Sequence, residues 1–396
     1  MTGERKRPIF AALAVLIAAA DYLWALWYYG GLCALQIAPV IRYALAAGID
    51  PCRAGLSGNS LLKEGIVMKV LVYGAGVIGA YLTHVLCEAG NDVTLLARGN
   101  WRRTLEAKGL TIRHHLQRKT TIDRPRIIGR DGISGHYDIV FFTMNYQQAG
   151  AILDDAAAMD ADVIVLVGNN LSAPDMEAYI KTHSKVPKQI LFGFQATAGK
   201  REGEVLICER MGAGKMNIGL LETPAQDALR EKMERLFENT VFRLRWYDAM
   251  ESFLKCHAAA VLPLAYLAYA AGCDYKRTTG EQRRRSMEAA REGYDLLVKL
   301  GYSIVPEDDD MFYRPGIRRV IMRALLFAMA KTVIGELAAA AHCRHAVSEM
   351  EQMDAAFERL RKKRPDFLMP NWDAMRNAMP DWAALRQQYE GATRHA

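Results

Sequence analysis

The stretch MKVLVYGAGVIGAYL at residues 68–82 decides the fold. It begins with KVLVY at 69–73, a nearly continuous apolar run that predicts a parallel strand buried on both faces. The glycine-rich segment GAGVIG follows at 74–79, and the chain after it predicts a helix over 77–89 and a second strand over 93–97. Strand, glycine turn, helix and second strand within about 30 residues predict a dinucleotide-binding Rossmann unit.

The three glycines of this segment have separate roles in such a unit. Gly74 permits a tight turn, Gly76 lets a pyrophosphate approach the backbone, and Gly79 lets the helix pack closely on the strand. The free amide groups and the positive end of the helix then face the phosphates. A glycine-rich turn without a ligand is the alternative, which this context disfavours. The predicted cofactor-binding segment is Gly74, Ala75, Gly76, Val77, Ile78 and Gly79.

The residue at the end of the second strand distinguishes NAD from NADP. An NAD site usually has a carboxylate there, about 20 positions beyond the glycines, which bonds the 2′-hydroxyl of the ribose. This chain has Arg98 instead, and a guanidinium pairs with a 2′-phosphate and stacks on adenine. We therefore expect NADP(H) as the cofactor. Arg102 and Arg103 either assist or form part of a solvated helix face.

Two further apolar runs, 137–143 (YDIVFFT) and 162–167 (DVIVLV), predict more strands of the same sheet. Polar residues follow each run, with Asn145 after the first and Asn169 and Asn170 after the second. Ligands of open parallel sheets lie beyond the carboxyl ends of the strands, so we expect these side chains to line the cofactor and substrate site. A helix is expected over 147–159, another strand over 190–194, and edge strands over 204–208 and 215–220.

Beyond Trp246 the apolar pattern is helical. Residues 249–271 form one long apolar helix, interrupted by Pro263, and the polar Lys255 and His257 near its middle favour a buried core helix over a membrane span. Further helices are expected over 281–299, 315–330, 331–360 and 372–388. The predicted fold class is α/β, with a hydrophobic N-terminal extension at 1–67, an NADP-binding Rossmann domain at 68–246 and an all-helical domain for substrate binding and dimerisation at 247–396.

The composition is that of a globular protein with enough apolar material for large cores. The 396 residues are 51% hydrophobic, and 51 basic against 44 acidic side chains leave a net charge of +7. Only short basic runs occur, so nucleic acid is not an expected partner. The seven cysteines are scattered without CxxC spacing, which predicts neither a metal site nor a disulfide framework and favours a reducing, cytoplasmic location.

The segment at 9–49 carries only two charges and follows the basic cluster at 5–7. Three interpretations are open. A secretory signal would export the rest of the chain. One or two membrane spans, 9–29 and 32–49, each approach the ~20 apolar residues that a bilayer requires, and a hairpin would leave both ends in the cytoplasm. Translation from Met68 is favoured slightly over the hairpin, because the codons before it can form a ribosome-binding sequence and the next segment binds a cytosolic cofactor.

Lys255 stands out among the polar residues of the helical half. Apolar neighbours on both sides predict that its ammonium is partly desolvated and its pKa lowered, which suits a proton donor near neutral pH. A lysine that extends to the surface is the alternative. His257 lies on a different face of the same helix and is interpreted as a core histidine with satisfied hydrogen bonds.

Taken together, the chain from Met68 resembles the ketopantoate reductase (2-dehydropantoate 2-reductase) family. The stretches that carry the resemblance are MKVLVYGAGVIGAYL at 68–82, LLARG at 95–99, YDIVFFTMNYQ at 137–147, VLVGNN at 165–170 and FLKCHAAAVLPLAYL at 253–267. The resemblance implies an NADP-dependent enzyme of pantothenate biosynthesis, with a Rossmann domain followed by a helical domain. It also implies that Gly74, Gly76, Gly79 and Arg98 bind the cofactor, that Asn169 lies near the nicotinamide, and that Lys255 is the catalytic lysine.

The chain departs from the family pattern at the substrate residues. Asn145 stands where the family usually has a lysine, and it is expected beside the cofactor. Ala259 and Pro263 replace two asparagines that follow the helical lysine, and Glu349 is the candidate for the family's late glutamate. We therefore expect an NADPH-dependent reductase of a 2-oxo acid or related carbonyl compound, similar to 2-dehydropantoate 2-reductase but with an altered substrate site, in which Lys255 and Asn169 are catalytic residues. The alternative is a non-catalytic NADP-binding or redox-sensing protein derived from this family.

Overall fold

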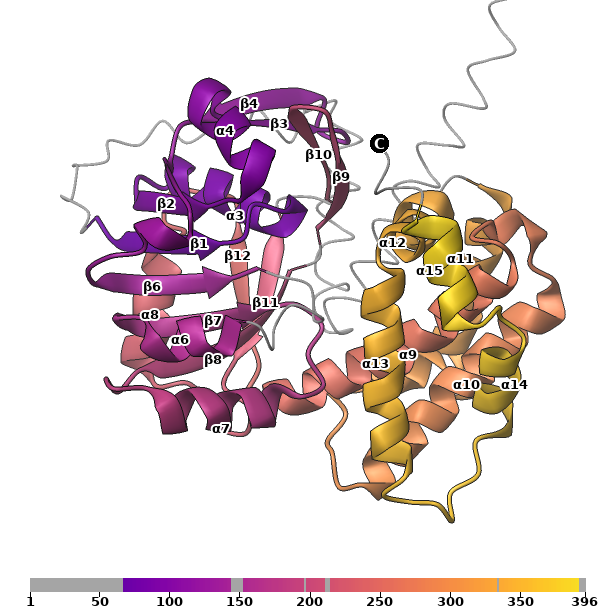
Figure 1. Ribbon diagram of the computed structural model, residues 1–396. Coiled ribbons are helices and arrows are strands. Elements are labelled where there is room, and N and C mark those ends of the chain that lie inside the picture. The colour runs from indigo at the N-terminus through magenta and orange to yellow at the C-terminus, as the bar shows by residue number, and fades with distance from the viewer. Residues whose placement is uncertain (1–66, 144–151, 196, 211–213, 333–334, 392–396) are drawn as a thin grey trace, which may run out of the picture. The chain divides into compact units, whose positions relative to one another are not determined.

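The computed structural model describes residues 67–143, 152–195, 197–210, 214–332 and 335–391 (Figure 1). The predicted hydrophobic extension and Asn145 lie outside the described residues. Residues Pro306–Leu325 belong to one compact unit of the chain, and Val67–Val305 with Leu326–Ala396 form another. The second unit contains all the strands and most of the helices described below.

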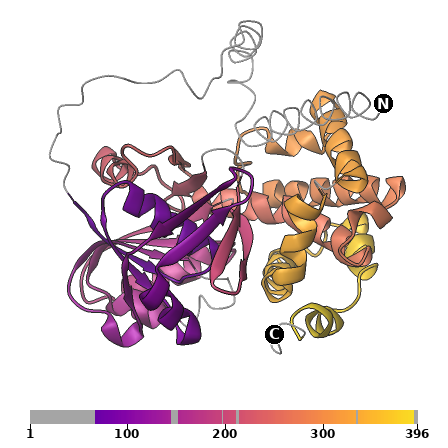
Figure 2. The ribbon, with the colours of Figure 1, turned by 90° about the horizontal axis from the view of Figure 1, so that it is seen from above.

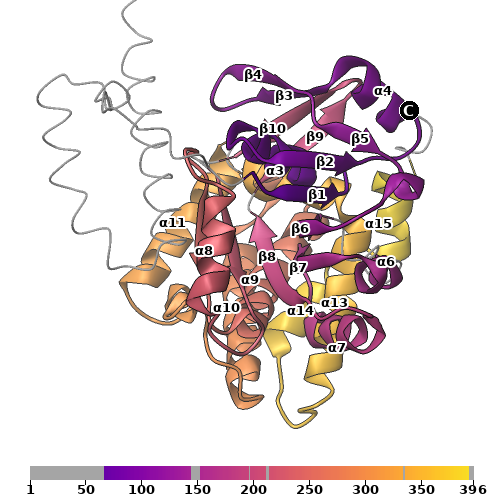
Figure 3. The same ribbon diagram turned by 90° about the vertical axis from the view of Figure 1, so that its left-hand side faces the viewer.

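An eight-stranded sheet dominates the first half of the chain, with the order β12-β11-β8-β7-β6-β1-β2-β5 (Figure 3). Neighbouring strands from β8 to β5 are parallel, while β11 runs antiparallel to β8 and parallel to β12. The Rossmann-type fold class predicted from the sequence is confirmed. The strands of this sheet are β1 (Lys69–Tyr73), β2 (Asp92–Leu96), β5 (Arg126–Ile128), β6 (Tyr137–Phe142), β7 (Ala161–Val167), β8 (Gln189–Gln195), β11 (Lys215–Gly219) and β12 (Arg243–Trp246).

Helices cover both faces of this sheet because alternate residues of its apolar strands point to opposite sides. Val70 and Val72 of β1 belong to a core shared with α3, α4 and α8. Leu71 and Tyr73 of the same strand belong to a second core, shared with α6, α7 and the first turn of α9. The covering helices are α3 (Val77–Glu88), α4 (Gly99–Lys108), α6 (Leu153–Ala158), α7 (Ala173–His183) and α8 (Asp227–Arg235).

A second, four-stranded sheet with the order β4-β3-β10-β9 packs against α3. Its strands are β3 (Leu110–His114), β4 (Lys119–Asp123), β9 (Ala198–Glu202) and β10 (Val205–Glu209). The expectation that 204–208 and 215–220 are edge strands is therefore wrong in both cases. The first stretch forms β10, which lies inside the small sheet between β3 and β9. The second forms β11, and β12 pairs with it on its outer side, so β12 is the edge strand of the main sheet.

The described chain after Trp246 contains helices and no strand (Figures 1 and 2). α10 packs against both α9 and α14, and α13 packs against α9 and α15. The helix expected over 331–360 is divided, since a turn of π-helix at Glu336–Ala340 and two α-helices that meet at Ala346 replace it. The helices are α9 (Met250–Ala270), α10 (Gly280–Lys299), α11 (Ile317–Lys331), α12 (Ala341–His345), α13 (Val347–Arg361), α14 (Pro370–Asn377) and α15 (Trp382–Tyr389).

α9 is the one helix of the described chain whose length and apolarity match a membrane span, and 78% of its most apolar window is buried inside the protein. Its first turn belongs to the core below the sheet, through Met250, Phe253 and Leu254. The helix continues through Pro263 and packs on α10 and α13 further along. These contacts are those of a core helix that joins the two halves of the chain.

Candidate functional site

The glycine turn after β1 has the geometry that close helix packing requires. Gly74 adopts φ +123°, a conformation that favours glycine. A Cβ on Gly79 would overlap the carbonyl oxygen of Gly74 and lie 3.1 Å from its carbon. Thr143, at the end of β6, closes the other side, since its Oγ1 donates a hydrogen bond of 2.9 Å to the same Gly74 oxygen. Only glycine fits at position 79.

Gly76 lies at the start of α3 and faces open space. It has an ordinary extended conformation, φ −79° and ψ −173°, and it is the N-cap residue of the helix. No side chain caps this end, and a Cβ on Gly76 would meet no atom within 4 Å. Free amide groups at a helix N-terminus attract anions, and the missing Cβ leaves room for them. These residues therefore fit the pyrophosphate of a dinucleotide.

Arg98 extends beyond the carboxyl end of β2, directly beside the strand that carries the glycine turn. It is the exposed N-cap residue of α4, and among the described residues no carboxylate forms an ion pair with it. Trp101 ties α4 to the turn, because its Nε1 donates a hydrogen bond of 3.0 Å to the carbonyl oxygen of Ala75. Arg102 is already paired, with Glu106 at 2.7 Å. Arg98 is thus an exposed cation that could pair with a phosphate group of a bound dinucleotide.

Asn169 and Asn170 follow β7, and the structure gives them different partners. The Nδ2 of Asn169 donates a hydrogen bond of 2.7 Å to Glu349 Oε1 on α13, and both side chains are buried. The Oδ1 of Asn169 is also buried but accepts no hydrogen bond within the described part of the chain. Asn170 instead holds the following turn, since its Oδ1 accepts from the amide of Ser172 at 3.1 Å. Asn169 therefore offers one buried acceptor to a ligand.

The sequence did not predict that Asn169 and Glu349 would meet, since they are 180 positions apart. Only the family resemblance points to Glu349, as the candidate late glutamate, and no pattern in the chain indicates its partner. Only the docking of α13 beside the end of β7 brings these two side chains together.

Lys255 is only 2% exposed and lies within the helical half. It forms an ion pair with Glu251, one turn earlier on α9, and its Nζ lies 4.4 Å from the centre of the Tyr302 ring. Burial lowers the pKa of Lys255, while the hydrogen bond and charge of Glu251 act in the opposite direction. The apolar surroundings match the expectation from the sequence, and the Glu-to-Lys spacing of four residues is the signal that indicates the ion pair.

The sequence predicts that His257 is a core histidine with satisfied hydrogen bonds, and the structure differs in the hydrogen bonds. The residue is half-buried, and its ring lies against Phe194 of β8 with 4.2 Å between the ring centres and the ring planes tilted by 49°. Within the described ranges, neither ring nitrogen forms a hydrogen bond to a protein group. Burial, and secondly the nearby His342, lower the pKa of His257 to about 4.

The positions where the family has asparagines are packing positions in this chain. Ala259 is fully buried and faces Gly293 of α10, where an added Cβ would lie only 3.0 Å from the Ala259 Cβ. Pro263 is buried as well, and its carbonyl oxygen accepts a hydrogen bond of 3.1 Å from Ser286 Oγ. The close approach of α9 and α10 leaves no room for an asparagine at 259.

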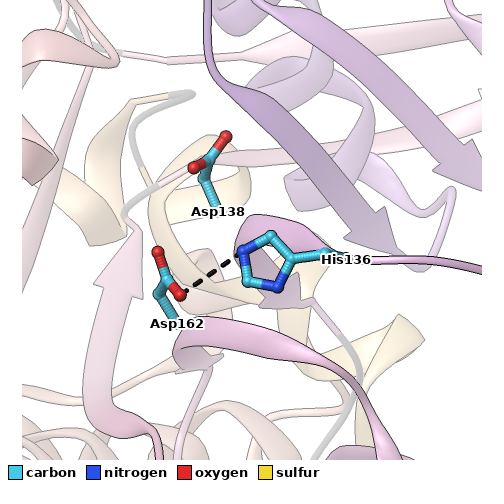
Figure 4. A group of neighbouring side chains, drawn as sticks. All are labelled: His136, Asp138 and Asp162. Carbon is cyan, nitrogen blue, oxygen red and sulfur yellow. Dashed lines mark ion pairs between the residues drawn. The ribbon is translucent and has the colours of Figure 1, made fainter.

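A separate polar group lies at the amino ends of β6 and β7. Its members are His136, Asp138 and Asp162, whose potential ligand atoms lie within 4.8 Å of one another (Figure 4). Lys232 already neutralises Asp162 at 2.5 Å, and the amide of Lys69 donates to Asp138 at 2.7 Å. This exposed ion-pair network stabilises the edge of the sheet that is opposite the glycine turn.

Residues 70–223 match the family model described as ketopantoate reductase PanE/ApbA. Over 88 residues the chain is 35% identical to the uncharacterized oxidoreductase YkpB of Bacillus subtilis (strain 168). That match spans 22% of this chain and 28% of the relative's length.

Several solved structures share the fold. One is a PanE/ApbA family ketopantoate reductase from Ralstonia eutropha JMP134, with a TM-score of 0.59, 15% identity, and coverage of 82% of this chain and 100% of the other. Another is the 2-dehydropantoate 2-reductase from Methylococcus capsulatus, with a TM-score of 0.56, 16% identity, and coverage of 81% and 96%. D-mandelate dehydrogenase with NADH and anilino(oxo)acetate gives a TM-score of 0.59 at 15% identity, covering 82% and 100%. Residues 70–223 thus match the ketopantoate reductase family model, and the chain shares its fold with solved ketopantoate reductases.

Proposed function

We propose that this protein reduces a 2-oxo acid or a related carbonyl compound with NADPH. The observation that carries the proposal is the open, uncapped start of α3 at Gly76, together with the exposed Arg98 at the end of the neighbouring strand, which forms no ion pair with the described residues. This pair fits a dinucleotide that bears a 2′-phosphate. The structural neighbour D-mandelate dehydrogenase, which was solved with NADH and anilino(oxo)acetate, supports the same class of reaction.

The residues of the glycine turn and Arg98 would hold the cofactor, whose nicotinamide supplies a hydride when bound. The amides of Val77 and Ile78 at the start of α3 lie where they can donate to the pyrophosphate. The buried Oδ1 of Asn169 accepts no protein hydrogen bond within the described ranges, so it suits the amide group of the nicotinamide or a donor on the substrate. Glu349 fixes the Asn169 side chain through its Nδ2 and thereby directs that oxygen.

Lys255 is the proposed proton donor on the strength of the family resemblance. Burial lowers its pKa below the usual lysine value, which makes release of its proton easier than from an exposed lysine. In this structure, however, its ammonium is held by Glu251 and the Tyr302 ring, so proton transfer to a substrate requires that ion pair to open. The role of Lys255 is therefore the part of the proposal that most needs a direct test.

A spectrophotometric assay of NADPH oxidation against a panel of 2-oxo acids, ketopantoate included, tests the function. We expect turnover of at least one member, and a weaker response with NADH. Lys255→Ala should lower turnover by orders of magnitude and leave the NADPH dissociation constant within about twofold, since Lys255 has no contact with the glycine turn. Unchanged turnover in this variant would refute its proposed role.

A second candidate function is NADP binding without catalysis, as in a redox sensor. The packing of Ala259 against Gly293 favours it, because this contact excludes the family's asparagine from position 259. Micromolar NADPH binding with no turnover of any member of the panel would support this alternative. We also propose a cytoplasmic location, a homodimer, and membrane association through residues 9–49. Gel filtration measures the oligomeric state, and cell fractionation measures the location and the membrane association.

A further inference from the structure

Gln195, at the carboxyl end of β8, carries a buried side-chain amide with one unused atom. The residue is only 2% exposed. Its Nε2 donates hydrogen bonds to the carbonyl oxygen of Ile78, at 3.2 Å, and to Oγ1 of Thr197, at 3.1 Å. Its Oε1 is buried as well and accepts no hydrogen bond from the residues that the structure describes. Both N–H groups of this amide are therefore used, and one acceptor is left.

The orientation of this amide follows from its partners. The carbonyl oxygen of Ile78 can only accept a hydrogen bond, so the amide atom that faces it must be the nitrogen. The same reasoning applies to Asn169, whose Nδ2 donates to a carboxylate oxygen of Glu349. In both amides the nitrogen is held by the protein, and the oxygen is the atom that remains for a ligand.

Gln195 and Asn169 lie at neighbouring strand ends of the main sheet. β7 and β8 are parallel, and Val167 pairs with Gly193. The amide of Gly168 donates a hydrogen bond of 2.9 Å to the carbonyl oxygen of Gly193, so the pairing continues past the last residue of β7. Asn169 and Gln195 each come two residues after the paired Val167 and Gly193. Because neighbouring strands are about 4.8 Å apart, the two amides stand next to each other at the carboxyl edge of the sheet.

This edge lies on the nicotinamide side of the glycine turn. In the order β8-β7-β6-β1-β2, the strand β2 that leads to Arg98 is on one side of β1, and β6, β7 and β8 are on the other (Figure 3). A dinucleotide whose adenosine half lies beside Arg98 crosses the glycine turn after β1 and extends its nicotinamide half over β6 and β7. Gln195 reaches toward this half from β8, since its amide contacts the first turn of α3 at Ile78.

Two adjacent buried acceptors suit a primary carboxamide. The NH2 group of the nicotinamide carboxamide has two N–H groups, so each acceptor can take one. A buried acceptor without a donor is unfavourable, and a ligand that supplies donors is therefore bound more tightly than one that does not. Phosphate groups accept hydrogen bonds and do not supply the donors that this place requires.

We infer that Gln195 accepts one N–H of the nicotinamide carboxamide while Asn169 accepts the other. The inference rests on the proposed function, in which a nicotinamide dinucleotide is bound. The two contacts hold the nicotinamide ring against rotation about its bond to the ribose, so the same face of the ring always meets the substrate. Lys255 keeps its proposed role as the proton donor.

A pair of cofactors tests this contact without depending on turnover. In the 3-acetylpyridine analogue of NADPH a methyl group replaces the carboxamide NH2, so the analogue keeps the ring and its carbonyl but lacks both donors. The dissociation constants of NADPH and of the analogue are measured by fluorescence titration of the full chain. The preference is the ratio of the two constants, in which any general effect of a substitution on the cofactor site cancels.

The variants are Gln195→Met and the matched control Gln117→Met. Methionine is close to glutamine in length and has no amide. Gln117 lies in the turn between β3 and β4, where its Nε2 donates to the carbonyl oxygen of Arg210 at 3.1 Å. Its Oε1 is also buried without a partner in the described ranges, so the control removes the same kind of amide from the small sheet. Melting temperatures show whether each variant folds.

We expect the wild type to prefer NADPH by about 100-fold, which is about tenfold for each buried acceptor that the analogue leaves without a donor. Gln195→Met should reduce the preference to about tenfold, because only the acceptor of Asn169 remains. Gln117→Met should keep the wild-type preference.

Two results would overturn the inference while the proposed function stands. One is a wild-type preference below threefold, which tests the contact even where Gln195→Met is unstable. The other is a Gln195→Met preference within twofold of the wild type, as expected if Gln195 meets a ribose hydroxyl that both cofactors carry. A wild-type protein that binds neither NADPH nor NADH would contradict the proposed function, and the role of Gln195 with it.

Discussion

Two alanine substitutions in the glycine turn separate cofactor binding from folding. At Gly76 the backbone is extended and an added Cβ has no neighbour within 4 Å, so Gly76→Ala fits the folded chain. The loss of unfolded-state entropy favours alanine by about 0.4–1 kcal/mol, and its poorer N-cap preference opposes this by about the same amount. The free energy of unfolding should therefore change by less than about 1 kcal/mol. The new methyl group stands where the pyrophosphate must approach.

At Gly79, in contrast, an added Cβ has no room. The Cβ would overlap the Gly74 carbonyl and Thr143 Oγ1, which are backbone and hydrogen-bonded atoms that cannot easily move. Overpacking of this kind costs about 1–3 kcal/mol or more. Gly79→Ala should therefore lower the melting temperature, whereas Gly76→Ala should not.

The measurements are thermal unfolding followed by circular dichroism, and NADPH titration followed by fluorescence. Gly76→Ala should weaken NADPH binding at least tenfold, which corresponds to about 1.4 kcal/mol, at an unchanged melting temperature. A Gly76→Ala protein that binds NADPH within twofold of wild type would refute the assignment of this turn to the pyrophosphate. A Gly79→Ala protein as stable as wild type would refute the packing argument.

Three further predictions concern selectivity and stability. Arg98→Glu should weaken NADPH binding more than tenfold and NADH binding less than threefold in the same titration. The reason is that the exposed guanidinium has no ion-pair partner in the described chain and is available for the 2′-phosphate. Equal losses of affinity for the two cofactors would argue against a 2′-phosphate contact. Burial, and secondly the charge of His84, lower the pKa of His114 to about 4. Below pH 6.5 His114 is therefore protonated in the unfolded chain but stays neutral in the folded chain, which favours unfolding. Stability should then fall by about 2 kcal/mol between pH 8 and pH 5 in urea unfolding, and His114→Gln should reduce this slope; an identical slope would contradict it. Asp354→Asn should destabilise the helical half by about 3 kcal/mol, because Asp354 is buried and pairs with Arg376 at 2.8 Å, and an unchanged melting temperature would contradict this.

The local part of the fold could be predicted because its signals are contiguous. The strand at 69–73, the three glycines and the following helix interact with their sequence neighbours, so an apolar run and a turn motif suffice to place them. The strands β3, β4 and β5 had no such signal. β3 and β4 are short and polar on one side, and β3 pairs with β10, which lies more than ninety positions later in the chain.

The same division applies to the candidate site. By itself the sequence determined that the chain has a Rossmann-type unit, an arginine after its second strand, and a long apolar helix carrying Lys255 and His257 two residues apart. Which side of that helix is covered could not be read from its sequence, because both sides are apolar. The tertiary structure decided it: the ammonium of Lys255 meets Glu251 and the ring of Tyr302, whereas the ring of His257 lies against Phe194 of β8. A helix has faces in its sequence, but only the elements that pack on it determine what each face contacts.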